Sequence, residues 1–305
     1  MAVIRSLAQA AVAVWEASET GLKVQLTQHA MKLWLSEELP VGKLPSGFVP
    51  PQKPARPEGL QVVEARNVPS RGKGGALVRR LTMLHALAHI ESWAIDLSWD
   101  ILGRFLPHED EGETCPSVGV TMPREFYGDW LRVADDECRH HCMLVERMAQ
   151  LDGMKYGDLP VHEGLWESAE KTSDSLLARL AIVHMVHEAR GLDVTPGTIR
   201  KFQGSGDVDS ATMLESIFQD EITHVEAGVK WFRYLCEERE GLDHPQTLQR
   251  FYQLVRERFH GNLKPPFNKE ARAQAGMTEE WYEPLHQDAP SEPEEGPEGT
   301  NSSSH

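Results

Sequence analysis

The stretch Ala134-Asp135-Asp136-Glu137-Cys138-Arg139-His140-His141 decides both the fold and the chemistry expected of this chain. On a helix, Glu137 and His140 project from the same face one turn apart, so a carboxylate and an imidazole can bind one metal ion together. Further along, the chain repeats the arrangement as Gln219-Asp220-Glu221-Ile222-Thr223-His224, again with an Asp directly before the Glu. Two matched pairs on separate helical segments predict one shared metal site.

The composition is that of an ordinary globular protein: 305 residues, 40% hydrophobic and 26% charged. The formal charge is −16, and residues 273–305 carry eight Asp and Glu and no Lys or Arg, which leaves −8 (−16 + 8) for the rest. An acidic surface repels phosphate backbones, so nucleic-acid binding is not expected, and the basic cluster between Arg66 and Arg80 is interpreted as a solvated surface. No apolar run is long enough for a membrane span.

The four cysteines form neither a CxxC motif nor a secreted-type framework. Cys138 and Cys142 lie on one helical face and are interpreted as reduced core thiols, with a metal pair as the less favoured alternative. The Ala/Val-rich N-terminus resembles a targeting segment, but Glu16 and Glu19 follow at once, so a mature amphipathic helix is favoured. We therefore expect a cytoplasmic protein, and the N-terminus leaves mitochondrial targeting open.

Apolar periodicity predicts helices along nearly the whole chain. Residues 1–37 should form one or two helices with a break at Gly21, and the seven prolines from Pro40 to Pro69 predict an extended connection that wraps the body. Four long helices are expected over 76–100, 123–151, 173–192 and 207–239, the third closed by Gly191 and Pro196-Gly197 and the fourth capped by Asp207. Shorter helices should cover 245–259 and 269–274, and a disordered acidic tail should begin at Pro284. No sustained alternating pattern occurs, so the fold class is all-α.

The four long helices carry a specific set of charged residues on otherwise apolar faces. The first offers Glu91 and the third Glu188, while the second and fourth each offer a Glu-x-x-His pair. One Glu from each of two helices and a Glu-x-x-His from each of the others is the ligand set of di-iron and di-manganese carboxylate bundles. The predicted metal ligands are Glu91, Glu137, His140, Glu188, Glu221 and His224. Four carboxylates balance two divalent ions, which makes such a buried cluster electrically tolerable.

Residues around this set are expected to support it. Asp136 and Asp220 should each hydrogen-bond the histidine of the opposite helix and fix its orientation, and Arg139 should balance their charge. His184 lies one turn before Glu188 and is predicted beside the metals. The remaining core histidines, His85, His89, His141 and His187, are interpreted mainly as packed and hydrogen-bonded. Trp93, Trp99, Trp130 and Trp231 are interpreted chiefly as core residues.

The Asp136-Glu137-Cys138-Arg139-His140 and Asp220-Glu221-Ile222-Thr223-His224 runs resemble signatures of the ferritin-like di-iron superfamily. His85-Ala86-Leu87-Ala88-His89-Ile90-Glu91-Ser92-Trp93-Ala94-Ile95-Asp96-Leu97 and His187-Glu188-Ala189-Arg190-Gly191-Leu192-Asp193 resemble domain-of-unknown-function family 455, a branch of that superfamily. The resemblance covers about residues 75–260 and implies a ferritin-like four-helix bundle with a di-iron centre. The related tRNA-modifying hydroxylases share the ligand pattern, but the acidity of this chain argues against their substrate. The expected divisions are 1–74 (N-terminal helices and wrap), 75–262 (bundle) and 263–305 (C-terminal extension).

The predicted function is that of a non-haem di-iron oxygenase or oxidase that uses dioxygen to oxidise a small organic substrate. Manganese or a mixed pair is an alternative to two irons. No flavin, nicotinamide or iron–sulfur motif occurs in the sequence, so a separate electron donor or reductase is expected, and a homodimer is left open. The alternatives are an iron-handling role, such as ferroxidation or storage, and a non-catalytic bundle.

Overall fold

The structure is a computed structural model that describes residues 4–68, 76–259 and 261–287. Within these ranges the chain is all-helical and forms no strand, which confirms the predicted fold class. Two isolated β-bridges, Leu44 with His108 and Val62 with Val161, tie the long N-terminal connection to the loops of the body. No helix in the described ranges is long and apolar enough to cross a membrane.

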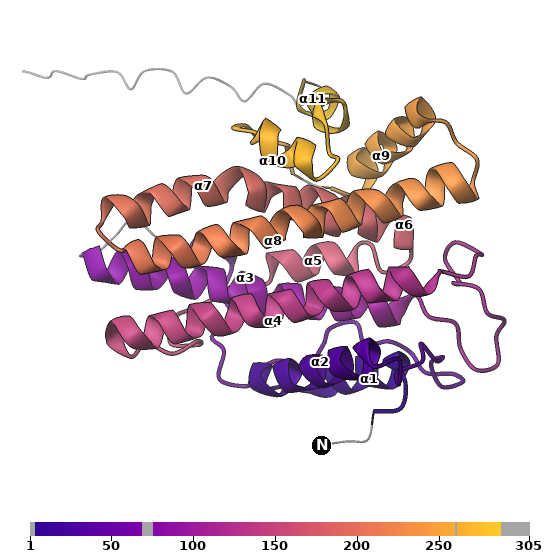
Figure 1. The fold of residues 1–305 in the computed structure, drawn as a ribbon, viewed down its shortest axis with the longest axis horizontal. Helices are drawn as coiled ribbons and strands as arrows, with labels where there is room; N and C mark the ends of the chain where they lie inside the picture. The colour runs from indigo at the N-terminus through magenta and orange to yellow at the C-terminus, as the bar shows by residue number, and fades with distance from the viewer. Residues whose placement is uncertain (1–3, 69–75, 260, 288–305) are drawn as a thin grey trace, which may run out of the picture.

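Four long helical segments lie side by side and form the body of the molecule (Figure 1). They are α3 (Ala76–Arg104), α4 (Arg124–Asp152), α6-η2-α7 (Leu176–Arg179, Leu180–His187 and Glu188–Gly204) and α8-η3 (Val208–Arg233 and Tyr234–Arg239). α3 packs mainly on α4, and α7 on α8, while α4 and α8 join the two pairs. Asp207 caps α8 as predicted, because its side chain accepts a hydrogen bond from the backbone N–H of Ser210.

The third segment differs from the prediction, since it does not close at Gly191 or Pro196-Gly197 but continues to Gly204. Pro196 lacks the N–H that would pair with the carbonyl of Leu192 four residues earlier. The side-chain amide of Asn268 donates to this carbonyl instead, at 3.2 Å. A contact from the C-terminal extension therefore replaces the hydrogen bond that proline removes.

The part of this segment directly before Glu188, Leu180–His187, is a π-helix, η2. It approaches α8 closely at Gly228, where a Cβ atom would lie 2.3 Å from the carbonyl oxygen of His184. Only glycine permits this approach. The close contact fixes η2, and with it Glu188, against the helix that carries Glu221 and His224.

The N-terminal region forms α1 (Leu7–Glu16) and α2 (Thr20–Leu35). The break lies at residues 17–19, whereas Gly21, the predicted break, sits in the first turn of α2. α1 packs on α3 and α2 on α4, and in Figure 1 the pair lies against one side of the body. The following connection, which contains the 3₁₀-helix η1 (Ala65–Asn67), runs over the body as expected.

The C-terminal region adds α9 (His244–Arg258), α10 (Lys269–Gln274) and α11 (Glu279–Gln287) over the other side of the body (Figure 1). α9 and α10 match their predictions. The sequence did not indicate α11 or the short α5 (Gly164–Glu170), and the tail expected from Pro284 was placed too early, because Pro284 lies within α11. The remaining tail, 288–305, lies outside the described residues, as do Arg71 and Lys73 of the basic cluster.

The interpretation of Cys138 and Cys142 as a pair of core thiols was half wrong. All four cysteines are free, and Cys138 is buried, but Cys142 is exposed. A spacing of four residues places two side chains on one helical face. It does not determine how far a neighbouring element covers that face. The four tryptophans expected in the core, Trp93, Trp99, Trp130 and Trp231, are all buried.

Candidate metal centre

Four of the predicted ligands form a tight group where the long helices face one another. Each of these residues offers one oxygen or nitrogen atom, and these atoms all lie within 4.8 Å of one another. The group contains Glu91 of α3, Glu137 and His140 of α4, and Glu221 of α8. All four are buried. Since three separate helices contribute, the group exists only because these helices pack together.

His224 and Glu188 complete the predicted set in different ways. The Nδ1 atom of His224 lies 3.0 Å from Oε1 of Glu137 and 3.6 Å from Oε2 of Glu221, so it joins the group from α8. Glu188 lies outside the tight group, although burial and the charges of Glu221 and Glu137 raise its pKa well above the usual value. Glu188 also lines the same cavity as the three other glutamates. It therefore faces the group from the third long segment.

Each of the two histidines contacts an aspartate of the other helix: His140 of α4 contacts Asp220 of α8, and His224 of α8 contacts Asp136 of α4. Nε2 of His140 lies 3.1 Å from Oδ2 of Asp220, and Nε2 of His224 lies 3.4 Å from Oδ2 of Asp136. Nε2 of each ring faces an aspartate, and therefore Nδ1 of each ring faces the glutamates. Nδ1 of His140 lies 3.6 Å from a carboxylate oxygen of Glu137 and 3.6 Å from one of Glu221. The two Asp-Glu-x-x-His runs thus meet as the pseudo-twofold halves that their sequences suggest.

Arg139 joins the two halves at the surface. Its guanidinium donates to Asp136 at 2.6 Å and to Asp220 at 3.0 Å. Burial alone would raise the pKa of Asp136, but His224 and Arg139 lower it. His140 lowers the pKa of Asp220 to about 2, with Arg139 adding to the effect. Both aspartates are therefore ionised acceptors at neutral pH, as a group that orients a histidine must be.

In the cluster, burial and like charges oppose ionisation of some groups, while opposite charges favour ionisation of others. Burial and the neighbouring charge of Glu137 raise the pKa of Glu91 well above its usual value. In Glu137 itself, the two histidines outweigh burial and hold the pKa well below that value. Burial opposes the charging of His140, but Asp220 and Glu137 raise its pKa to about 12. Without a metal the cluster therefore retains protons, which bound cations would displace.

Three buried polar atoms of the cluster have no partner in hydrogen-bond geometry, although charged groups lie within 4 Å of them: Oε2 of Glu137 and the Nδ1 atoms of His140 and His224. An unsatisfied buried polar atom costs roughly 1–3 kcal/mol, and unpaired groups of this kind are rare in native proteins. All three are atoms that can donate an electron pair to a metal ion. The residues present therefore fit a pair of first-row metal ions with mixed oxygen and nitrogen ligands.

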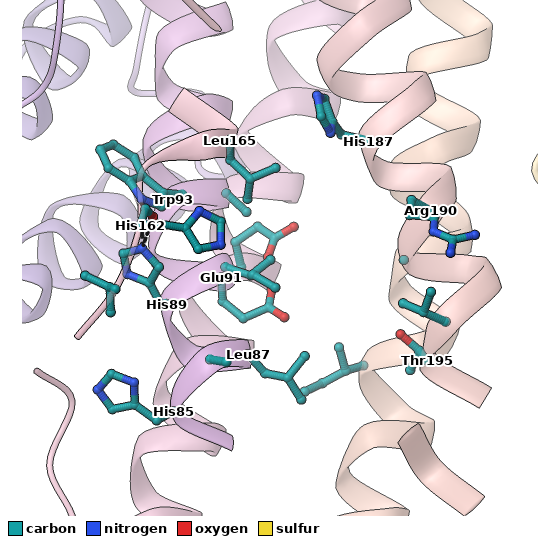
Figure 2. Close-up of a pocket in the computed structure, with 18 of the residues that line it drawn as sticks. His85, Leu87, His89, Glu91, Trp93, His162, Leu165, His187, Arg190 and Thr195 are labelled. Carbon is teal, nitrogen blue, oxygen red and sulfur yellow. Dashed lines mark hydrogen bonds between the residues drawn. The ribbon is translucent and has the colours of Figure 1, made fainter. Parts of the chain in front are cut away.

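A cavity of about 310 Å³ reaches the cluster from one side (Figure 2). All four glutamates of the predicted set line it, but neither His140 nor His224 does. Its walls come from α3, η2-α7, α8 and the segment 159–165 that leads into α5. This segment was not predicted as part of the site, because its residues show neither helical periodicity nor a Glu-x-x-His pattern. The carboxylates thus face a space that can admit a molecule, while the histidines face Asp136, Asp220 and Arg139.

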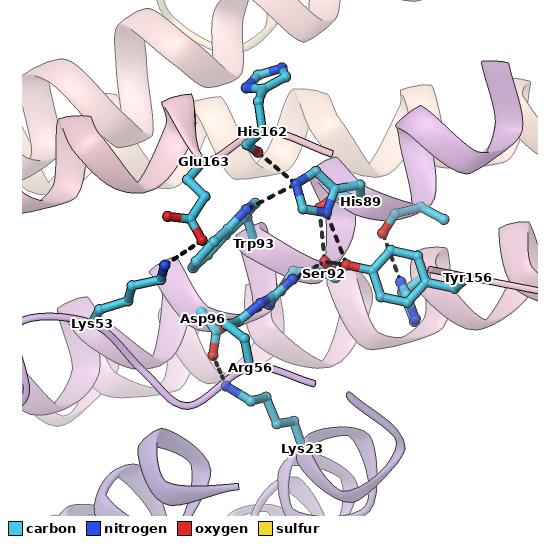
Figure 3. A network of polar contacts seen from close by, with 12 residues as sticks. Lys23, Lys53, Arg56, His89, Ser92, Trp93, Asp96, Tyr156, His162 and Glu163 are labelled. Atoms are coloured by element: carbon cyan, nitrogen blue, oxygen red, sulfur yellow. Dashed lines mark hydrogen bonds and ion pairs between the residues drawn. The ribbon is translucent and has the colours of Figure 1, made fainter. Parts of the chain in front are cut away.

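A second polar network lies on α3 next to Glu91 (Figure 3). Asp96, fully buried, pairs with Lys23 of α2 and with Arg56 of the N-terminal connection. Arg56 also donates to the hydroxyl groups of Ser92 and Tyr156, at 2.7 and 3.0 Å. A buried charge requires such partners, but their positions in the sequence gave no sign of the pairing. The network anchors the N-terminal region to the helix turn that carries Glu91.

The additional histidines are mostly hydrogen-bonded in the core, as interpreted. His89 lies 2.9 Å through Nδ1 from Tyr156 and 2.7 Å through Nε2 from the carbonyl of His162, and so it points away from the metal group. His85, His141 and His187 contact the N–H of Gly157, the carbonyl of Ala88 and the hydroxyl of Ser168. His184 differs from them: its buried ring lies against Trp130, with centroids 4.2 Å apart, and neither nitrogen has a hydrogen-bond partner.

These features define a class of all-helical proteins in which two Asp-Glu-x-x-His runs form a buried cluster of carboxylates and histidines. The chain matches the family described as "Protein of unknown function (DUF455)" over residues 16–283 and belongs to that family, which confirms the predicted resemblance to family 455. It is 35% identical over 274 residues to an uncharacterized protein of Haemophilus influenzae, covering 87% of this chain and 91% of the relative. No solved structure matches.

Proposed function

We propose that the chain is a ferritin-like di-iron protein that uses dioxygen to oxidise a small organic substrate. The observation that supports the proposal is the two-fold cluster, in which Oε2 of Glu137 and Nδ1 of His140 and His224 are buried without hydrogen-bond partners. Glu91, Glu137, His140, Glu188, Glu221 and His224 would hold the two ions. Manganese or a mixed pair would satisfy the same ligands.

The bound ions would supply redox chemistry with dioxygen, which no protein side chain provides. The protein would supply the rest. Four carboxylates balance the charge of two divalent ions in a dry core, and Asp136 and Asp220 hold the histidines with Nδ1 toward the glutamates. The cavity admits a substrate on the carboxylate side.

In an oxygenase reaction, one oxygen atom of O₂ enters a C–H bond of the substrate to give an alcohol. The other oxygen atom is reduced to water by two electrons and two protons. The electrons must come from a separate donor, because the sequence contains no flavin, nicotinamide or iron–sulfur motif. A reductase or a reducing co-substrate is therefore part of this proposal.

The second candidate is an iron-handling protein that oxidises or stores Fe(II) without an organic substrate. It shares the metal cluster, so the cluster does not separate the two. The cavity favours the oxygenase, because an iron-handling site needs a polar path for hydrated ions, whereas this cavity is lined mainly by apolar side chains.

The test loads anaerobic protein with Fe(II) and then admits oxygen. We expect two irons per chain and rapid oxygen consumption in the wild type, and loss of both in Glu137→Ala. Glu226→Ala is the matched control, since Glu226 is an exposed residue of α8 near the ligands and should behave as the wild type. Stoichiometry well below two irons, or an unchanged Glu137→Ala variant, would contradict the proposal. Repeated oxidation of added Fe(II) would instead favour the iron-handling candidate.

A further inference from the structure

We propose that the cavity beside Glu91 binds a neutral, apolar organic molecule rather than an ion, and that such molecules are the substrate class of this protein. Oxidation as the fate of the bound molecule rests on the function proposed above. Binding in the cavity does not rest on it, because it follows from the shape, lining and charge of the cavity.

The lining is the first argument. Aliphatic side chains from three of the four long segments form most of the wall, among them Leu87, Ile90, Ala94, Val183, Leu214 and Ile217. Figure 2 shows Leu87 and Leu165 close to Glu91 on opposite sides of it. Such a surface gains free energy when it is removed from water by an apolar molecule, by roughly 25 cal/mol per Å².

The basic groups along the wall are the second argument, because several of their nitrogen atoms already contact other groups. The guanidinium of Arg190 donates to the carbonyl of Lys264 at 2.7 Å and lies 3.5 Å from Asp193, and in Figure 2 it points away from Glu91. His187 contacts Ser168 through Nε2. Both nitrogens of His89 contact Tyr156 or the backbone of His162. An anionic group that paired with these nitrogens would have to displace the existing contacts.

The inner wall is the third argument. Glu91, Glu137, Glu188 and Glu221 line it, so an anionic substrate would approach four carboxylates. With two divalent ions bound, these four charges are balanced, and the wall then has no net charge that would attract either an anion or a cation. A neutral molecule gives up little hydration when it approaches this wall, whereas an ion gives up much of its own.

The volume limits the size of the molecule. At about 310 Å³ the cavity lies at the lower end of the range of roughly 300–1,000 Å³ found for small-molecule sites. A compact hydrocarbon such as a two-ring aromatic compound is a suitable probe. 2-Methylnaphthalene and 2-naphthoate have nearly the same shape and differ in charge, so the pair tests the proposal directly.

The experiment measures binding of both probes by equilibrium dialysis to protein loaded with Zn(II), which is redox-inert and prevents turnover. We expect 2-methylnaphthalene to bind at least tenfold more tightly than 2-naphthoate. Val183→Phe and, as a second cavity-filling variant, Leu87→Trp should weaken its binding at least tenfold. Val208→Phe is the matched control, because Val208 is 65% exposed and does not line the cavity. Thermal melts would establish that each variant is folded.

Equal binding of 2-naphthoate, no binding of 2-methylnaphthalene, or unchanged binding by both filled variants would overturn the inference. Zinc is measured in the same samples to separate the two proposals. Two zinc ions per chain without hydrocarbon binding would overturn the cavity inference and leave the metal centre standing. Hydrocarbon binding without zinc would support the cavity inference and contradict the metal centre.

Discussion

His140 and Asp220 lie on different helices, yet Nε2 of the imidazole is 3.1 Å from Oδ2 of the carboxylate. The reciprocal pair, His224 with Asp136, is 3.4 Å apart. Each aspartate directly precedes the glutamate of its own helix, so each half of the cluster orients the histidine of the other half. These two contacts turn Nδ1 of both rings toward the glutamates. The orientation of the histidine on each helix therefore depends on the aspartate of the other helix.

This dependence gives the first prediction. Asp220→Asn keeps the shape of the side chain but removes the charge that holds His140. We expect metal affinity to fall roughly 10–100-fold, as for other partners of ligating histidines, measured by competition with a chromogenic chelator. Asp135→Asn is the control, because Asp135 lines a surface groove together with Met31 of α2, on another face of α4. Equal affinity of Asp220→Asn and Asp135→Asn would contradict the orienting role.

A second prediction concerns a buried ion cluster away from the proposed metal site. Asp100 accepts hydrogen bonds from Arg104 and from the fully buried Arg179. Asp100→Asn would leave Arg179 with an uncompensated charge, and we expect the free energy of unfolding to fall by about 3–5 kcal/mol at pH 7. Urea titration followed by circular dichroism would measure it. A loss below about 1 kcal/mol would show that the pair contributes little.

The same pair predicts a pH dependence. Burial alone would raise the pKa of Asp100, but Arg179 and Arg104 lower it below 3.8. A carboxyl whose folded-state pKa is depressed contributes full stability above its unfolded pKa and loses that contribution as the pH falls through the folded one. The stability difference between wild type and Asp100→Asn should therefore be constant from about pH 7 to 5 and shrink below about pH 4. A difference that grew on acidification would contradict the assigned shift.

A fourth prediction tests the contact that sustains the helix past Pro196. Asn268 donates to the carbonyl of Leu192 and also caps α10 through its side-chain oxygen. Asn268→Asp keeps the cap but loses the donor, and we expect a cost of about 1–2 kcal/mol. In a Pro196→Ala background, the restored N–H can pair with Leu192, so the same substitution should cost less. Equal costs in the two backgrounds, measured by urea unfolding, would refute the compensation.

The close approach of η2 and α8 gives the last prediction. In Gly228→Ala the new methyl group would lie 2.3 Å from the carbonyl oxygen of His184, and backbone atoms cannot rotate away. We expect a loss of about 1–3 kcal/mol or more in stability, together with weaker metal binding, because η2 positions Glu188. In Gly197→Ala, the new Cβ would meet only the end of Arg200, at 3.8 Å, so this control should be neutral or slightly stabilising. Similar melting temperatures for the two variants would count against the close contact.

The sequence by itself determined most of the helices and the set of residues proposed to bind metal. Spacings of three and four residues are properties of a single helix, so Glu137 with His140 and Glu221 with His224 could be paired without knowledge of the fold. The apolar surroundings of Glu91 and Glu188 marked these two as inward-facing, and Asp207 marked the start of α8. All of this information is local in the chain.

The tertiary structure decided what depends on distant segments. It placed Glu188 beyond the tight group, formed the cavity from segments of four regions, and supplied Lys23 and Arg56 as partners of Asp96. It also carried the third helix through Pro196, because Asn268 lies where the unpaired carbonyl needs a donor. Helical periodicity specifies which face a side chain occupies, but the partner on that face is set by packing between segments far apart in the sequence.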